Sequence, residues 1–209
     1  MFLITNLSSL PIGESSMQLE LESPIDQSIM IEPSSSSTHL LSSEPSTPQF
    51  NSQHVIIGSN STDESRGIFS FRNVIINTNI IISANLEIHC KSVQDGSPNI
   101  VGKFYPALLN QQAILTESTW LEYSAGNLWD TPGAESLVDR SDWEPPASNP
   151  SGNNMTFEKY SINVTHLIQQ GFVQQLQEFN LLVASLNGMH ECLNSKSASN
   201  SPSLILELV

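Results

Sequence analysis

The chain has 209 residues, of which only 13% are charged, and its formal net charge is −14 at pH 7. This length allows one domain with an attached arm, or two small domains, with a sizeable core. Lysine and arginine together number seven, so the chain lacks the basic surface that nonspecific phosphate binding needs, and we expect no nucleic-acid partner. No run approaches the roughly 18 apolar residues of a membrane-spanning helix, so no membrane insertion is expected.

The N-terminus, MFLITNLSSLPIGESS, has neither a basic n-region nor a small-residue cleavage site, which argues against a secretory signal. We therefore expect a virion component that is made in a host cytoplasm and released by lysis, with secretion as the alternative. Residues 1–20 are predicted to form an arm that binds other virion proteins or further copies of the chain by adding a strand to a partner's sheet. The apolar contact residues of this arm are Phe2, Leu3, Ile4, Leu7 and Leu10.

Short alternating or β-branched runs, separated by Pro, Gly and Asn, predict strands along most of the remaining chain. The predicted strands are Met17–Leu21, Asp26–Glu32, His54–Gly58, Gly67–Phe71, Val74–Ile82, Ala84–Ile88, Ile100–Tyr105, Phe157–Val164, Asn180–Leu186 and Ser203–Val209. The spacing of apolar residues predicts one short helix over Thr165–Gln177, capped by Asn163 or Thr165. This pattern indicates an all-β fold, a two-sheet antiparallel sandwich (jelly roll) with one short helix and long loops.

Two features of the chain leave alternatives open. Residues 33–54 are rich in serine, and their composition alone predicts a linker. Cys90 and Cys192 each lie next to or near a histidine, but the paired C-x2-C spacing of zinc fingers is absent. Two buried free thiols are the favoured interpretation, ahead of a disulfide and of a metal site.

Several segments of the chain occur in the same order as the characteristic segments of a known family. They are Asp26–Ile29, His54–Gly58, Arg66–Phe71, Ser83–Ile88, Glu117–Trp120 followed by Trp129–Ala134, Ser161–Leu167, and the end of the chain from Asn194 to Leu206. Together they are similar to the DNRLRE-type domain, a jelly-roll family related to carbohydrate-binding modules and to disaggregatase-related proteins, over about residues 24–209. The resemblance implies a single domain over residues 21–209, in which the serine-rich tract is a surface segment and no linker. Asn163 and Asn194–Lys196 depart from the family pattern, which puts a shared charge network in doubt.

The segment Thr116–Glu135 holds two of the three tryptophans without a regular hydrophobic period. The favoured interpretation is that the indoles anchor a long loop, which needs large apolar side chains to stay ordered. The alternative is a sugar-stacking platform, as in modules that recognise cell-surface glycans. Its predicted residues are Trp120, Tyr123, Asn127 and Trp129, with Trp143 as a further candidate.

Acidic residues follow the second tryptophan closely. Asp130, Glu135 and Asp139 are candidate ligands for a structural Ca²⁺, although a solvated acidic rim is the favoured interpretation. No G-x-S-x-G, H-E-x-x-H or P-loop motif is present, so we expect no enzyme. The sequence thus predicts a non-enzymatic structural or adhesive virion protein, such as a capsid decoration or fibre component. A carbohydrate-binding module for host-surface glycans is the alternative.

Overall fold

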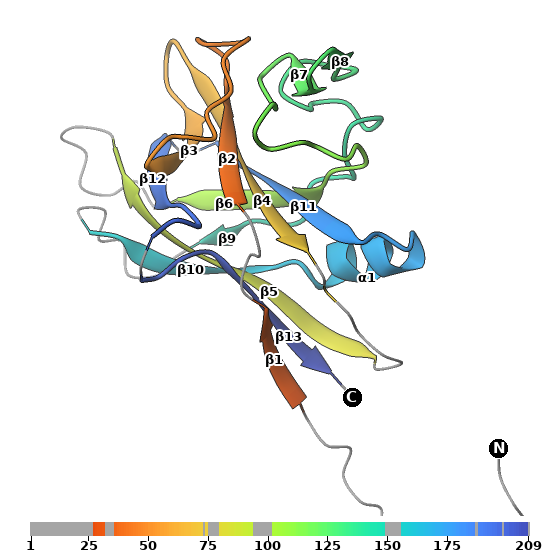
Figure 1. Cartoon of the computed structure of the whole chain (residues 1–209). Coiled ribbons are helices and arrows are strands. Elements are labelled where there is room, and N and C mark those ends of the chain that lie inside the picture. Colours follow the sequence, from red (N-terminus) through yellow and green to blue (C-terminus); the bar gives the residue numbers. More distant parts are fainter. Residues whose placement is uncertain are drawn as a thin grey trace, which may run out of the picture.

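The computed structural model describes residues 27–31, 36–72, 74, 80–93, 102–148, 156–186, 188–197 and 199–208. These residues form an antiparallel β sandwich with one short helix (Figure 1), which confirms the predicted all-β class. Residues 1–20, with the five predicted contact residues of the arm, lie outside the described part of the chain, as do the predicted strand Met17–Leu21 and most of Val74–Ile82. In the described part, no helix has the length and apolar character that crossing a membrane requires.

The longest stretch between two neighbouring strands of the main sheet in chain order is residues 109–146, between β6 and β9. In chain order the elements are β1 (Gln27–Ile31), β2 (Ser36–Leu41), β3 (His54–Ser59), β4 (Glu64–Arg72), β5 (Ile81–Ser92), β6 (Lys103–Leu108), β7 (Glu122–Ser124), β8 (Asn127–Leu128), β9 (Ala147–Ser148), β10 (Glu158–Asn163), α1 (Thr165–Val173), β11 (Glu178–Ser185), β12 (Met189–Leu193) and β13 (Ser203–Leu208). The main sheet has the order β1-β13-β5-β12-β3-β4-β11-β6-β9, with β10 paired to β5 and β2 paired to β4. β7 and β8 form a separate small hairpin.

The main core lies between two halves of this curled sheet. One half contains β13, β5, β10 and β12, and the other contains β4, β11 and β6, while β3 pairs with strands of both halves. Alternate residues point inward, so that Leu86 and Ile88 of β5 share one apolar cluster with Phe69 and Phe71 of β4. The same alternation turns the other side chains of β4 and β11 outward, toward the long loop.

The cysteines close the main core covalently. Cys90 on β5 lies directly opposite Cys192 on β12, and the two form a disulfide that joins positions 102 residues apart. The favoured prediction of two free thiols is therefore wrong. It failed because the two strands that carry the cysteines become neighbours only through the sheet topology, which the spacing in the sequence does not reveal.

The serine-rich tract contributes a buried strand. Residues 36–41 form β2, which pairs with β4 and is buried, so the composition-based prediction of a linker is wrong for these residues. Two hydroxyl groups at this strand have backbone partners, whereas Thr38 Oγ1 is buried without a partner among the described residues. The Ser195 N–H donates to Ser37 Oγ at 3.0 Å, and Ser65 Oγ of β4 donates to the Leu40 carbonyl at 3.1 Å.

The helix is shorter than the sequence predicts. It covers Thr165–Val173, and Gln175 has a φ of 57°, a left-handed conformation that stops the helix before residue 177. Neither predicted residue caps the helix in the usual way, because Val164 occupies the N-cap position. The Asn163 carboxamide accepts a hydrogen bond from the Thr165 N–H at 2.9 Å. The helix buries Leu167 and Ile168 in the main core.

Residues 109–146, here called the β6–β9 loop, pack on the outer face of the sheet (Figure 1). A second apolar cluster joins the loop to this face. Its sheet residues are Leu40, Ile68 and Leu182, and its loop residues are Leu109, Ala113, Leu115, Trp129 and Ala134. A bridge between Leu109 and Arg140 closes the loop at its base. The loop thereby covers one part of the outer face and leaves another part open.

Candidate functional site

Trp129 anchors the β6–β9 loop from inside. Its side chain is only 4% exposed, and its indole Nε1 donates to the Thr119 carbonyl at 3.0 Å. The ring of Tyr123 packs against it with the ring centroids 5.5 Å apart. A ring in this position holds the loop on the sheet and offers no face to a ligand.

The four predicted platform residues do not share one surface. Asn127 is the exposed first residue of β8, where its Nδ2 donates to Ser124 Oγ at 2.9 Å. Trp129 is buried, and Tyr123 is half-buried against it. Trp120 is the member of the predicted set that lines a pocket, together with Trp143.

This pocket lies on the part of the outer face that the loop leaves open, and its volume is about 810 Å³. Neighbouring residues of β4, β11 and β6 form the floor of the pocket. Ala184 of β11 pairs with Tyr105 of β6 and follows Val183, the partner of Gly67, which places Arg66, Ala184 and Tyr105 side by side across three strands. The sheet therefore presents one cation and one aromatic ring at the base of the pocket.

Two segments of the β6–β9 loop form the walls. Trp120, Thr131 and Pro132 belong to the middle of the loop, and Trp143 and Pro145 belong to the segment that returns along β6. The Glu144 N–H donates to the Pro106 carbonyl at 2.9 Å, which fixes this returning segment beside the floor. Trp120 and Trp143 are both half-buried, so each ring is held by the protein and still reaches the pocket.

The indoles are positioned by two buried arginines. The Arg66 guanidinium lies 5.4 Å from the ring centroid of Trp120 and 5.9 Å from that of Trp143, and the Arg140 guanidinium lies 4.1 Å from the ring of Trp143. We call these four residues the Trp–Arg cluster. Cation–π contacts of this kind contribute about 0.5–2 kcal/mol each, with the larger values at desolvated sites.

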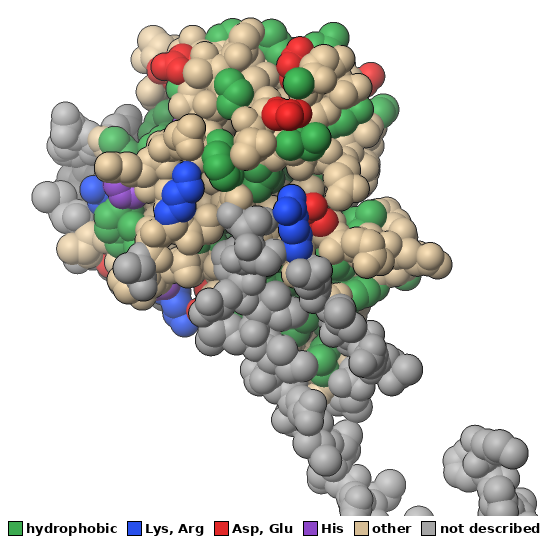
Figure 2. All heavy atoms as spheres, viewed as in Figure 1, with side chains coloured by type: hydrophobic (Ala, Val, Ile, Leu, Met, Phe, Trp, Pro, Cys, Tyr) green, Lys and Arg blue, Asp and Glu red, His purple; other side chains and the backbone are tan. Residues whose placement is uncertain are grey.

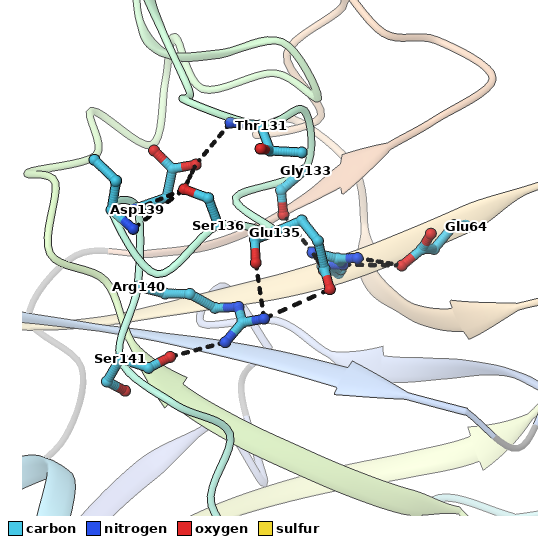
Figure 3. A network of polar contacts seen from close by, with 10 residues as sticks. Glu64, Thr131, Gly133, Glu135, Ser136, Asp139, Arg140 and Ser141 are labelled. Atoms are coloured by element: carbon cyan, nitrogen blue, oxygen red, sulfur yellow. Dashed lines mark hydrogen bonds and ion pairs between the residues drawn. The ribbon is translucent and has the colours of Figure 1, made fainter.

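Carboxylates hold both arginines in place. Arg66 donates to Glu64 Oε1 through Nε at 2.9 Å and through Nη2 at 2.6 Å, while its Nη1 donates to the Gly133 carbonyl at 2.8 Å and to Glu135. Glu135 also reaches Arg140 Nη2 at 3.5 Å, so one carboxylate bridges two guanidinium groups (Figure 3). Burial lowers the pKa of Arg140, and the charge of Glu135 opposes that shift.

The predicted Ca²⁺ ligands have other partners. Asp139 is buried, and its carboxylate accepts hydrogen bonds from the Asp130 N–H at 2.8 Å, the Thr131 N–H at 3.0 Å and Ser136 Oγ at 3.1 Å (Figure 3). Glu135 binds the arginines, and the Asp130 side chain is exposed. Among the described residues, no three His, Cys, Asp or Glu side chains are grouped so that they could hold a metal ion. Asp139 and Glu135 thus act as internal partners, Asp139 for backbone N–H groups and Glu135 for guanidinium groups.

A second, smaller hollow of about 480 Å³ lies on the other side of Glu144. Asp142, Arg140, His166 and Gln170 contribute to it, and His166 Nδ1 lies 2.7 Å from Glu144 Oε1. His166 is largely exposed there. Glu144 is thus shared by the two hollows, whereas Asp142 lines only the smaller one.

Sequence reasoning identified Trp120 and Trp143 but missed Arg66, Glu64 and Tyr105. The predicted strand Gly67–Phe71 begins one residue after Arg66, whereas β4 begins at Glu64 and includes Arg66. An arginine placed two positions before Ile68 on a strand shares the outward face with it, and that periodicity was the available signal. The partners themselves are brought together only by strand register.

The sequence matches no family model and none of the curated proteins. The resemblance to DNRLRE-type domains therefore stays a prediction. The all-β class rests on the structure itself.

Proposed function

We propose that this protein is a non-enzymatic carbohydrate-binding domain and that the pocket with Trp120, Trp143 and Tyr105 holds the glycan. The observation that carries the proposal is the pair of half-buried indoles at the walls of one pocket, next to carboxylate groups. The C–H faces of a sugar ring are apolar and suit flat aromatic surfaces, while its hydroxyl groups need hydrogen-bond acceptors nearby. Ligand pockets combine these two features, an apolar lining with a few polar groups.

The aromatic wall is fixed before any ligand arrives. Gly133 has a φ of 76°, and a Cβ at this position would lie 2.7 Å from Cη2 of Trp120. The backbone of the loop therefore packs directly against this indole, and Arg66 contacts the same ring. Such preorganisation reduces the ordering cost of binding.

The ion-pair partners of the pocket carboxylates support glycan binding and argue against glycan hydrolysis. Glycosidases use two carboxyl groups as acid and nucleophile or base. Glu64 and Glu135 are instead paired with Arg66, and Glu144 is paired with His166. Each is engaged in positioning another side chain, which leaves no separate acid–base pair among the described residues that line the pocket.

The setting that we propose is extracellular. The disulfide between Cys90 and Cys192 supports this, because disulfides persist in oxidising environments. An adhesive virion component that binds a host-surface glycan, as the sequence predicts, and a secreted glycan-binding protein both fit this setting. The predicted arm of residues 1–20 lies outside the described residues, so the virion role stays a prediction.

A substitution at the pocket wall tests the proposal. Trp143→Ala removes one stacking face, and we expect glycan affinity to fall by about tenfold or more, equivalent to about 1.4 kcal/mol. Binding is detected on a glycan array and quantified by isothermal titration calorimetry with the glycan that binds best. Leu128→Ala is the matched control, because Leu128 is a large exposed side chain outside the pocket. Unchanged affinity in a folded Trp143→Ala variant, or no glycan bound by the native protein, would contradict the proposal.

A further inference from the structure

We propose that the pocket selects glycans that carry protonated amino groups and disfavours acidic glycans. This inference rests on the proposed glycan-binding function and specifies its ligand class. Among the described residues that line the pocket, the charged ones are Glu64, Glu135 and Glu144, with Arg66 as the single cation, which gives a formal charge of −3 + 1 = −2. The charge of the whole chain has the same sign, at −14.

The pocket offers acceptors on carboxylate groups. Glu64 uses Oε1 for both of its hydrogen bonds with Arg66, and Glu144 uses Oε1 for its contact with His166. In the described part of the chain, the second oxygen of each of these carboxylates has no hydrogen bond or ion pair. The side chain of Glu64 is 44% exposed and that of Glu144 is 25% exposed, so a ligand can reach them. Each of these oxygens can accept a charge-assisted hydrogen bond from an ammonium group.

The guanidinium groups of the site are already engaged. Arg66 uses Nε, Nη1 and Nη2 for Glu64, Gly133 and Glu135. Arg140 lines the smaller hollow; it donates to the carbonyl groups of Ser141 and Glu135, at 2.8 Å in each case, and its Nε is buried without a hydrogen-bond partner among the described residues. A carboxylate or sulfate on a ligand would therefore have to compete with these internal acceptors and would face the glutamates. Like charges brought together in this way cost affinity, whereas an amino group would be attracted.

The aromatic side chains in the walls also favour ligands with ammonium groups. An ammonium group over the face of an indole gains a cation–π interaction in addition to ring stacking. Arg66 and Arg140 already make such contacts with Trp120 and Trp143, so a ligand ammonium gains this interaction only on a ring face that is turned to the pocket and not covered by a guanidinium. A glycan with amino substituents can thus combine stacking, cation–π contact and ion pairing in one site.

The experiment compares three sugar hexamers of equal length by isothermal titration calorimetry at mildly acidic pH. They are a glucosamine hexamer, its N-acetylated neutral form and a galacturonate hexamer. We expect the glucosamine hexamer to bind at least about tenfold more tightly than the neutral form, and the galacturonate hexamer to bind most weakly. Equal affinity for all three, or tighter binding of the galacturonate, would overturn the selectivity and leave glycan binding intact. If none of the three binds, the selectivity is also overturned, and the glycan array described above decides separately whether the protein binds any glycan.

Paired variants separate a local effect from attraction by the overall charge. Glu144→Gln keeps the shape of the side chain and removes one charge from the pocket, and we expect the preference for the glucosamine hexamer to fall severalfold. Asp142→Asn removes the same charge two residues away, in the smaller hollow, and should leave the preference unchanged. An equal loss in both variants would overturn the proposal, because it would show that overall charge alone causes the preference.

Discussion

The main core and the β6–β9 loop are held together by different means. The main core buries aliphatic and aromatic side chains from strands of both halves of the sheet and contains the disulfide. The loop rests on a smaller apolar cluster and on polar contacts of Asp139, Arg66 and Arg140 (Figure 3). In the face seen in Figure 2, acidic side chains lie dispersed among apolar and uncharged ones over the upper part of the molecule. The difference implies that substitutions in the core change global stability, whereas substitutions in the loop change the pocket first.

The largest expected effect concerns the disulfide of the main core. Replacing Cys90 and Cys192 by alanine removes a cross-link that spans 102 residues, and the chain-entropy relation gives a loss of about 4.7 kcal/mol. Urea unfolding of the variant and the native protein measures the change in the free energy of unfolding. The main core and the loop should unfold together in this variant, and a loss below about 1 kcal/mol would contradict the role assigned to the cross-link.

A buried histidine makes the stability of the core depend on pH. Burial lowers the pKa of His39 on β2 from 6.5 to about 4. The unfolded chain therefore binds a proton before the folded chain does as the pH falls. Protonation of His39 therefore does not affect the free energy of unfolding above pH 6.5. Between pH 6.5 and about pH 4 it lowers the free energy of unfolding progressively, by about 3 kcal/mol in total.

This prediction is checked by urea unfolding across that pH range. His39→Gln should remove most of the slope between about pH 6.5 and 4, whereas His166→Gln, at an exposed position, should retain it. The same slope in the native protein and in His39→Gln would show that another group causes the acid sensitivity.

A smaller global effect is expected when the loop anchor is removed. Trp129→Ala should lower the global free energy of unfolding by less than about 2 kcal/mol, because the loop can detach while the core stays folded. Hydrogen exchange measured by mass spectrometry should become faster in residues 109–146 and stay slow in β5 and β11. Faster exchange throughout the chain would contradict the distinction between the two regions.

The core was predictable from the sequence, and the pocket largely was not. Alternation of apolar residues identified β4, β5 and β10, because burial on one face leaves a period of two in the sequence, and a β-branched run identified β3. β2 was missed because serine and threonine fill its buried positions. β12, with the sequence MHECL, was missed because its few apolar positions do not stand out.

The pocket depends on contacts between residues that are distant in the sequence. Arg66 meets Trp143 only because β4, β11 and β6 lie side by side and the loop returns along β6. No local pattern specifies that register. The tryptophans could be recognised as important, but which of them is buried and which lines the pocket is decided by packing on the outer face of the sheet.

The three indole N–H groups provide the most direct test of the proposed binding site. Each tryptophan gives its own indole signal in a ¹H–¹⁵N correlation spectrum, and the signals can be assigned with single Trp→Phe variants. On titration with a glycan that binds, the signals of Trp120 and Trp143 should shift, while that of Trp129, bonded to the Thr119 carbonyl, should stay in place. A glycan that binds and shifts the signal of Trp129, or neither of the other two, would show that the ligand occupies another site.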